Sequence, residues 1–380
     1  MDVSEGLPTI VIDFGSSVAK AGFAGDDFPI FSMPSTIGIP KYPRCMPSLV
    51  HDREFYVGDE AQKHRGILSL HYPVERGIVK DWDSYEKVMD YILIEGLGID
   101  CSHHPILYAE PALNPLSNGE MIAELMFEKF NALSFYLTLK PALALYASGS
   151  VTGSILYSGG GITTTMAVFE GCKIKQATNR VNFGGRDVTN YLIKLLSEKN
   201  YIFITPAERE IGREIKETLC FVSKDYELDL NMAAKHPATR TKDYILPDGQ
   251  TLKLTKEMFQ SPEILFTPSA AGREENGVQD LILSTVAKCD IDLRKNLYSN
   301  LIITGGNTMF PGFSDRLRKE LRSKVNQKTP VCLIAPEERR FMVWLGGSIL
   351  ASLSACKKLF IAKSEYDAEG SKIIHKKCLL

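Results

Sequence analysis

The sequence lacks the patterns that mark membrane, secreted and nucleic-acid-binding proteins. No apolar run is long enough to span a bilayer, and the stretch 1–5 does not have the features of a signal peptide. The 44 lysines and arginines are balanced by 46 aspartates and glutamates, so no basic surplus indicates general nucleic-acid binding. The eight cysteines form no C-x-x-C pair, which argues against a metal cluster or disulfide framework. We therefore expect reduced thiols and no membrane insertion.

Strand-like and helix-like segments alternate along the 380 residues, which is typical of an α/β protein with two domains. Buried-type strands are predicted at His104–Glu110 and at 301–304, where a glycine turn follows. The mixed charged and small residues from Asp229 to Thr241 predict a surface loop. Helical spacing or helix-start signals predict helices at 83–97, 118–130, 140–148, 187–198, 207–222 and 313–324.

Two short stretches are similar to each other and predict a pair of phosphate-binding turns. In both, 10–25 and 155–171, an apolar run leads into a Gly/Ser turn and a second run that ends in aromatic-x-Gly. Backbone N–H groups in such turns converge on one spot, which suits a phosphate. The first turn carries a carboxylate, Asp13, whereas Tyr157 and Gly160 supply none in the second. A plain glycine-rich hairpin is the alternative interpretation.

Longer motifs resemble actin and the actin-related proteins over nearly the whole chain. They include Lys20–Asp26, Gly77–Trp82 and Lys288–Lys295, together with 56–62, 65–68, 145–149, 185–187 and 344–353. The resemblance implies an actin-like ATPase fold, in which two ribonuclease-H-like domains enclose a nucleotide cleft. It implies a first domain of residues 1–147 and 343–380, with 35–73 as a small inserted subdomain, and a second domain of residues 148–342.

The resemblance also implies a site for ATP or ADP. The positions that match the family's nucleotide contacts are Gly15, Ser16, Ser17, Lys20, Gly159, Gly160, Gly161, Gly185, Lys216, Glu217, Gly305, Gly306, Met309, Phe310 and Arg340. Arginine at 340 replaces a lysine and can stack on adenine. Phe14 departs from the family, in which this position is small and polar, and it is expected to pack behind the turn. By themselves, Lys216 and Glu217 would be a solvated helix pair.

The reactive side of the site has changed. Tyr157 replaces a carboxylate, Lys140 a glutamine and Thr164 a histidine, and Arg76 stands where conventional actins carry a modified histidine. Phosphoryl transfer needs a positioned water and charge neutralisation, so we expect slow or absent ATP hydrolysis and no catalytic residue. A weakened Mg²⁺ site would rest on Asp13 acting through water. Lys140 either enters the cleft as a substitute cation or points to solvent.

Two loops and a groove match the family's contact surfaces. The excursion 41–56 keeps an apolar tip of Cys45, Met46, Leu49 and Val50, whereas the loop 266–275 has alanines and an arginine where actin has large apolar side chains. This loss of apolar area argues against a homopolymer. The groove residues match positions where actin-binding proteins insert a helix: Tyr146, Gly149, Gly171, Leu345, Ile349, Leu350 and Leu353. Leu345, Ile349 and Leu350 also have core spacing.

These features favour a divergent actin-related protein that binds ATP or ADP as a structural ligand in a multi-protein or filament-associated assembly. Its partners would be other cytoskeletal or actin-family proteins, in the cytoplasm or the nucleus. The alternatives are a polymerising actin-like ATPase and, within the same group of folds, a sugar or acetate kinase or a chaperone-type ATPase. The long actin-type segments and the absence of a sugar-binding domain disfavour the third.

Overall fold

Two mixed sheets of the same topology form the centre of the molecule. The computed structural model describes residues 7–41, 53–236 and 241–378. The first sheet has the order β18-β10-β9-β1-β2-β3, in which β1 runs antiparallel to β2 and parallel to β9. Its strands are β1 (Ile10–Phe14), β2 (Val18–Phe23), β3 (Phe31–Pro34), β9 (Pro105–Glu110), β10 (Ser134–Leu139) and β18 (Ile361–Ala362).

The second sheet repeats this arrangement, with the order β13-β12-β11-β16-β17. Here β11 runs antiparallel to β12 and parallel to β16. Its strands are β11 (Gly153–Ser158), β12 (Thr163–Phe169), β13 (Cys172–Val181), β16 (Leu301–Thr304) and β17 (Leu333–Ile334). The similarity of the two hairpins in the sequence therefore reflects one strand plan used twice.

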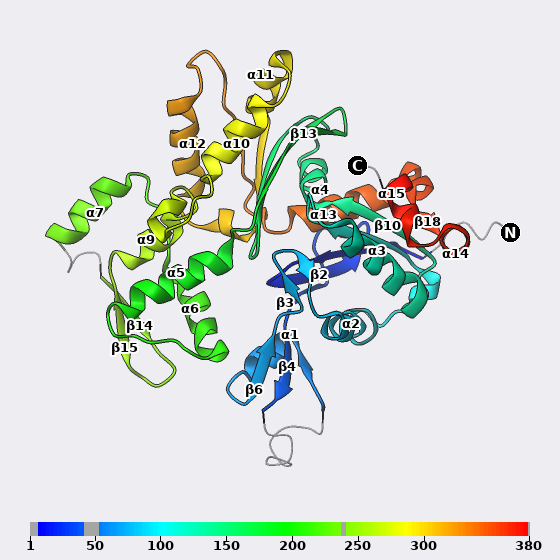
Figure 1. The fold of residues 1–380 in the computed structure, drawn as a ribbon, viewed down its shortest axis with the longest axis horizontal. Coiled ribbons are helices and arrows are strands. Elements are labelled where there is room, and N and C mark those ends of the chain that lie inside the picture. Colours follow the sequence, from blue (N-terminus) through cyan, green and yellow to red (C-terminus); the bar gives the residue numbers. More distant parts are fainter. Residues whose placement is uncertain (1–6, 42–52, 237–240, 379–380) are drawn as a thin grey trace.

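Helices cover both sheets (Figure 1). Around the first sheet lie α2 (Trp82–Asp90), α3 (Leu116–Glu124), α14 (Lys363–Glu369) and α15 (Ile374–Lys377), with the π-helical extensions η1 (Tyr91–Gly96) and η3 (Leu125–Lys129). Around the second lie α5 (Gly185–Ser197), α6 (Pro206–Leu219), α9 (Glu257–Glu263), α10 (Val278–Ala287), α11 (Ile291–Ser299) and α12 (Phe313–Lys324). None of the helices in the described ranges is long and apolar enough to cross a membrane.

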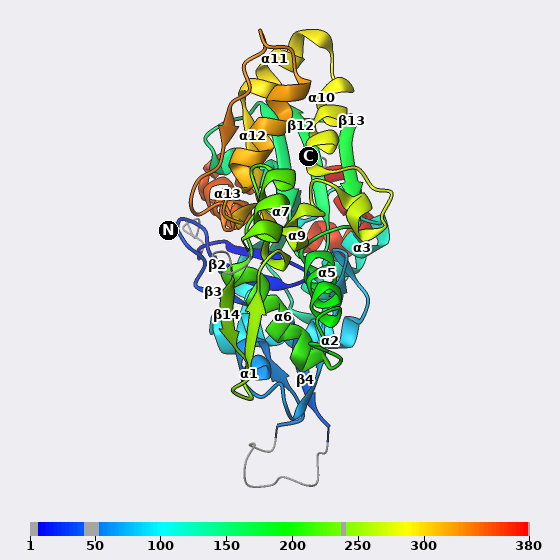
Figure 2. The same cartoon turned by 90° about the vertical axis from the view of Figure 1, so that its left-hand side faces the viewer.

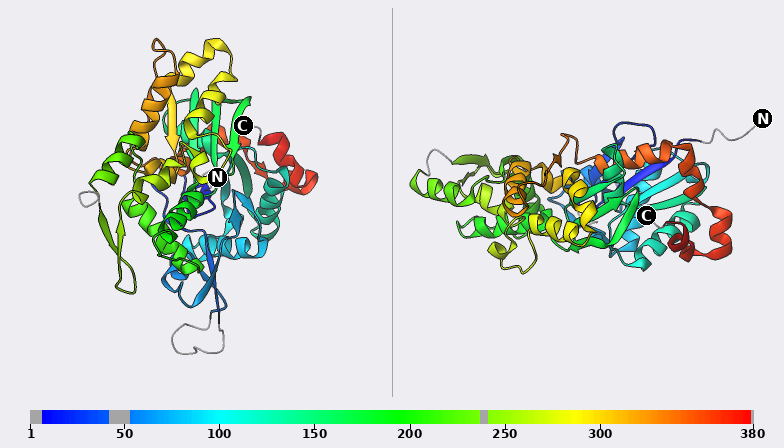
Figure 3. Two further views of the ribbon diagram at one scale, coloured as in Figure 1. Left: turned by 60° about the vertical axis from the view of Figure 1, so that its left-hand side comes forward. Right: turned by 90° about the horizontal axis from the view of Figure 1, so that it is seen from above.

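A small sheet lies at one end of the molecule. It has the order β5-β4-β6, built from Tyr56–Val57, Ile37–Pro40 and Leu68–His71, and carries α1 (Gly58–Lys63). Figure 2 shows it at the end opposite α11, and Figure 3 shows from above how thin the molecule is compared with its breadth in Figure 1. Cys45, Met46, Leu49 and Val50 lie outside the described residues. Two further ribbons are β7 with β8 (Val74–Glu75, Ile78–Val79) and β14 with β15 (Lys242–Ile245, Thr251–Leu254).

One local prediction is wrong. Most of the segment predicted as a loop from Asp229 onward belongs to α7 (Tyr226–Lys235). The helix begins at Asp225, whose carboxylate accepts a hydrogen bond from Leu228 N, and this cap satisfies a backbone donor. Only Ala233 of α7 is buried, so its sequence carries little of the apolar periodicity by which helices are recognised. Residues 237–240 lie outside the described ranges.

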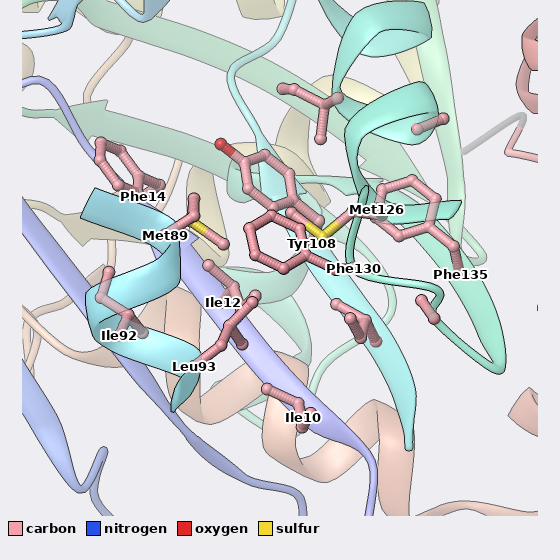
Figure 4. Close-up of a cluster of buried hydrophobic side chains, with 14 of the residues drawn as sticks. Ile10, Ile12, Phe14, Met89, Ile92, Leu93, Tyr108, Met126, Phe130 and Phe135 are labelled. Atoms are coloured by element: carbon pink, nitrogen blue, oxygen red, sulfur yellow. The ribbon is translucent and has the colours of Figure 1, made fainter. Parts of the chain in front are cut away.

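The core has one part on the first sheet, one between the two sheets and one on the second sheet. Figure 4 shows Ile10, Ile12 and Phe14 of β1 packing with side chains from the helices that cover the first sheet. The second part holds α4 (Lys140–Ala147) and α13 (Met342–Ser352) against residues of both sheets, and Trp344 Nε1 donates to Val11 O at 3.0 Å. The seven cysteines in the described residues are unpaired thiols in this structure.

Candidate functional site

The two glycine turns face each other in direct contact. A Cβ atom added to Gly160 would lie 2.1 Å from Ser17 Oγ, and one added to Gly161 would lie 2.6 Å from Ser16 Oγ. Only glycine fits opposite these serines, so the hydroxyl group of Ser17 on the first turn occupies the room beside Gly160 on the second. Ser17 and Gly160 are therefore complementary in space.

The turns present free backbone donors. Gly15 N bonds to Val18 O at 3.0 Å and Gly159 N bonds to Ile162 O at 2.9 Å, which closes each hairpin. The N–H groups of the next residues, Ser16, Ser17, Gly160 and Gly161, bond to no acceptor in the described part of the chain. Successive unpaired N–H groups in a turn form a concave site for an anion. Two such turns, one opposite the other, suit a polyphosphate.

Two lysines flank the only carboxylate in the turns. Lys20 Nζ lies 2.9 Å from Asp13 Oδ2, and Lys140 Nζ lies 2.8 Å from Asp13 Oδ1. Lys140 also donates to Phe14 O at 2.8 Å, and only 1% of this lysine is exposed. The ammonium group therefore enters the site, and the alternative in which it points to solvent is wrong. Phe14 packs behind the turn, with its ring centroid 4.7 Å from that of Tyr85.

This arrangement does not fit a divalent ion. Burial by itself raises the pKa of Asp13, but the charges of Lys140 and Lys20 outweigh burial and hold that pKa well below its ordinary value. Both carboxylate oxygens face an ammonium group. Burial raises the pKa of Tyr157 far above its ordinary value, so this phenol stays neutral. The described residues contain no group of three or more His, Cys, Asp or Glu side chains placed to hold a metal.

The side of the site that would activate water lacks a base. Thr164 is 1% exposed, and its hydroxyl bonds to no group in the described ranges. A threonine hydroxyl and a neutral tyrosine take up no proton at neutral pH. The local chemistry therefore supports anion binding better than attack by water.

Most residues expected around adenosine lie on three elements or next to them, whereas Arg340 lies in the turn before α13. Lys216 of α6 is buried and donates to Gly185 O at 3.3 Å, whereas Glu217 is exposed and pairs with Arg213 at 3.2 Å. Gly305, with φ of +97°, takes a conformation that favours glycine, and Gly306 and Met309 follow it in η5 (Gly306–Met309). Phe310 is buried in the core of the second sheet. Arg340 is exposed and stacks on Phe341, 4.4 Å from the ring centroid.

Several polar links between the halves were not predicted as site residues. Arg76 donates to Gly161 O at 3.0 Å and pairs with both oxygens of the buried Asp187 carboxylate. Arg186 donates to Ser16 O and lies 4.5 Å from the ring centroid of Tyr72. Within the second half, Asn307 donates to Gly159 O at 2.8 Å. The motifs that contain these residues can be recognised in the sequence. Which residues pair cannot, because the partners lie up to 170 positions apart.

A second set of links lies between the small sheet and α6. Arg65 pairs with Glu214 at 2.6 Å, and Tyr72 Oη donates to Glu210 at 2.5 Å. Arg213 pairs with the same Glu210 carboxylate at 2.6 Å. These contacts connect the small sheet to α6, close to Arg186, which lies over the ring of Tyr72.

The loop 266–275 is held to the protein by its arginine. It contains the short helix η4 (Pro268–Ala271), whose residues Ser269 and Ala270 are exposed. Arg273 donates to Asp187 Oδ1 at 2.6 Å and lies over the ring of Phe183 at 5.2 Å. Asp187 therefore receives two arginines, one from each half of the chain.

The predicted groove residues lie on α4, on α13 and beside the β12–β13 turn. Helices α4 and α13 pack against each other. Tyr146 Oη lies 3.4 Å from Gly171 O, and Gly149 and Gly171 both have positive φ. On α13 and just after it, Ile349 and Leu353 are 41% and 53% exposed, whereas Leu345 and Leu350 are partly buried.

The family model described as Actin matches residues 4–379, which is nearly the whole chain.

Proposed function

The chain is a member of the actin family, and on this basis we propose that it binds ATP or ADP between its two glycine turns as a structural ligand. In this proposal a lysine replaces the metal, hydrolysis is slow or absent, and the protein serves as a subunit of a larger cytoskeletal assembly. The observation that carries the proposal is the buried Lys140, 2.8 Å from Asp13 and bonded to Phe14 O.

The phosphates would be held by backbone donors and fixed cations. The free N–H groups of Ser16, Ser17, Gly160 and Gly161 supply hydrogen bonds, and Lys20 and Lys140 supply positive charge. Because Asp13 neutralises one of the two ammonium groups, the set of three side chains keeps a net charge of about +1. This charge favours a polyphosphate without a divalent ion.

The adenosine would lie against Gly185, Lys216, Gly305, Gly306 and Met309. Burial lowers the pKa of Lys216, which favours hydrogen bonding to a neutral sugar or base over a solvated ion pair. Glu217 and Arg340 would complete the contact from the exposed side. In the same proposal the halves 1–147 with 343–380 and 148–342 act as the two domains around this nucleotide.

Metal dependence of nucleotide binding tests this proposal. The affinity of the wild-type protein for a fluorescent ATP analogue should be nearly the same in EDTA and in millimolar Mg²⁺. Lys140→Gln should weaken binding in EDTA by about 10-fold or more, because a charge-assisted contact is lost. Lys129→Gln changes an exposed lysine on η3 and should have no effect. Strictly Mg²⁺-dependent binding by the wild-type protein would refute the lysine substitution.

The surface of α13 supports a role in an assembly. Ile349 and Leu353 expose apolar area on α13 and just after it, where α13 packs on the helix that carries Tyr146. An amphipathic helix of a partner would cover them. Ser269 and Ala270 at the loop tip offer little area for a contact between copies of the chain. We therefore propose partner binding over homopolymerisation. Pelleting of the purified protein with ATP, in the absence of other proteins, would favour the polymerising alternative.

A further inference from the structure

A cavity of about 300 Å³ lies away from the two turns, between the first sheet and β13. Its walls come from both halves of the chain. Glu110 lies at the end of β9, Leu137 on β10, Gly119 on α3 and Ile374 on α15, while Lys173 and Lys175 come from β13. The volume suits a small organic ligand better than a single water or ion.

Glu110 brings to this cavity a carboxyl group that forms no direct ion pair with a described residue. The residue is only 9% exposed, and both of its hydrogen bonds, from Asn114 Nδ2 at 3.1 Å and Asn118 Nδ2 at 3.4 Å, go to Oε1. Among the described residues it has no ion-pair partner within 4.0 Å. A buried carboxylate without a cation is costly, so a cationic ligand at Oε2 would remove an existing penalty.

The rim of the cavity has the opposite charge. Lys173 and Lys175 are two residues apart on β13 and therefore point to the same side of the strand. Neither forms an ion pair with a described residue. Because Lys175 is exposed and Glu110 is buried, the cavity is negative at its inner end and positive at its outer end. Leu137 and Ile374 supply apolar area between them.

Hydrogen bonds between the halves hold the cavity open. Arg180 of β13 donates to Ala112 O at 3.2 Å, to Leu113 O at 3.0 Å and to Asn114 Oδ1 at 2.7 Å. These bonds fix the segment that follows Glu110 against β13, so the two walls are connected. At position 119 an added Cβ would lie 3.1 Å from Leu137 Cδ2 and 3.2 Å from Ile374 Cδ1, so even a methyl group here would press against the side chains that line the cavity.

We propose that this cavity binds a small zwitterion with an apolar middle. Its guanidinium or ammonium group would bond to Glu110, its carboxylate would lie toward Lys173 and Lys175, and its apolar part would contact Leu137 and Ile374. A guanidinium suits Glu110 because its planar donors match a carboxylate. The site shares no ligand-binding residue with the phosphate turns, so it does not depend on the nucleotide proposal.

Calorimetric titration with 4-guanidinobenzoate tests the site in the full-length protein. The wild-type protein should bind this probe saturably, and phenylguanidine and benzoate, which each lack one charge, should bind about 10-fold more weakly or worse. Glu110→Gln keeps the shape of the side chain and should lower the affinity for the probe by about 10-fold or more. Glu95→Gln changes an exposed acid on η1 and should leave the affinity unchanged.

A second variant keeps the test decisive if Glu110→Gln does not fold. Gly119→Val fills the cavity without changing a charge and should abolish binding in a protein that still melts cooperatively. The double variant Lys173→Gln/Lys175→Gln should weaken 4-guanidinobenzoate but leave phenylguanidine unaffected. The proposal is overturned if the wild-type protein shows no saturable binding at millimolar probe, or if neither Glu110→Gln nor Gly119→Val reduces it.

Discussion

Lys140 Nζ lies 2.8 Å from Asp13 Oδ1, and this contact determines the chemistry of the two turns. Both groups are buried, and the other oxygen of the carboxylate faces Lys20 at 2.9 Å. An ammonium group in this position supplies positive charge with fixed geometry, whereas a metal would need free carboxylate oxygens and water. The lysine at position 140 therefore supplies positive charge at a site where positions 157 and 160 offer no carboxylate to hold a metal.

Removing the charge of Lys140 should strongly destabilise the protein. Lys140→Met leaves Asp13 buried with Lys20 alone, and breaking one partner of a buried pair costs about 3–5 kcal/mol. Urea unfolding followed by circular dichroism measures the change. Lys129→Gln is the matched surface control and should stay within about 0.5 kcal/mol of the wild-type protein. A similar small loss for Lys140→Met would mean that the pair contributes little.

ATP hydrolysis should be restored, in part, by returning the three changed positions. The wild-type protein should release phosphate no faster than the uncatalysed background. The combination Lys140→Gln, Tyr157→Asp and Thr164→His supplies a carboxylate and a base, and positioned acid–base groups contribute about 10²–10⁴-fold. Phosphate release in Mg²⁺ measures the gain, and Thr164→His alone serves as the control that should not show it. Rapid release by the wild-type protein would contradict the proposed function.

The loop 266–275 should become mobile when Arg273 is removed. Arg273→Ala deletes one of two arginines on Asp187, and a hydrogen bond to a charged group is worth about 1.5–3 kcal/mol. Amide exchange at residues 268–276 should accelerate by about 10-fold or more. Arg318→Ala, which breaks an exposed pair with Asp315 on α12, should leave that exchange unchanged. Unchanged protection in Arg273→Ala would show that other contacts hold the loop.

Nucleotide exchange should be faster without Arg65. Its pair with Glu214 joins the small sheet to α6, and both side chains are partly exposed, at 23% and 40%. Such a pair is worth about 0.2–1 kcal/mol, so Arg65→Ala should speed release of a fluorescent nucleotide by about 1.5- to 5-fold. Arg53 pairs with Glu60 of α1, and Arg53→Ala is the control without effect. An equal increase in both variants would argue against a role for the link.

Ionisation of Glu110 should make stability fall as pH rises. Burial raises the pKa of Glu110, although the hydrogen bonds from Asn114 and Asn118 lower it. The charges of Arg180 and Lys140 also lower it. Between the unfolded pKa of about 4.3 and the raised folded value, the folded state keeps the proton that the unfolded state has lost. Stability therefore decreases with pH across this window and then levels off.

The variant Glu110→Gln isolates this effect. Its free energy of unfolding should not decrease across this pH window. The stability of Glu110→Gln relative to the wild-type protein should therefore increase as the pH rises above about 4.3. Chemical unfolding at a series of pH values measures both curves. If the difference in free energy of unfolding between the two proteins does not change with pH, the pKa of Glu110 is not raised in the folded state.

The sequence by itself determined the strand–turn–strand units, most helices and the family. Alternation and glycine turns predicted both hairpins, and α4 begins at Lys140 with a proline in its first turn, as expected. These features depend on neighbouring residues, which is why local patterns predict them. Helix α7 was missed because it buries only Ala233 and so lacks an apolar stripe.

Only the tertiary structure decided where the charges go. The sequence left Lys140 with two orientations, and packing of α4 against α13 and strands of both sheets placed its ammonium group on Asp13. Asp187 accepts hydrogen bonds from Arg76 and Arg273, which are 111 and 86 residues away in the sequence. Glu110 became a buried carboxyl group without a direct ion pair to a described residue because β9, α3 and β13 enclose it. Such pairings require two sheets to be brought together, and no local periodicity encodes that contact.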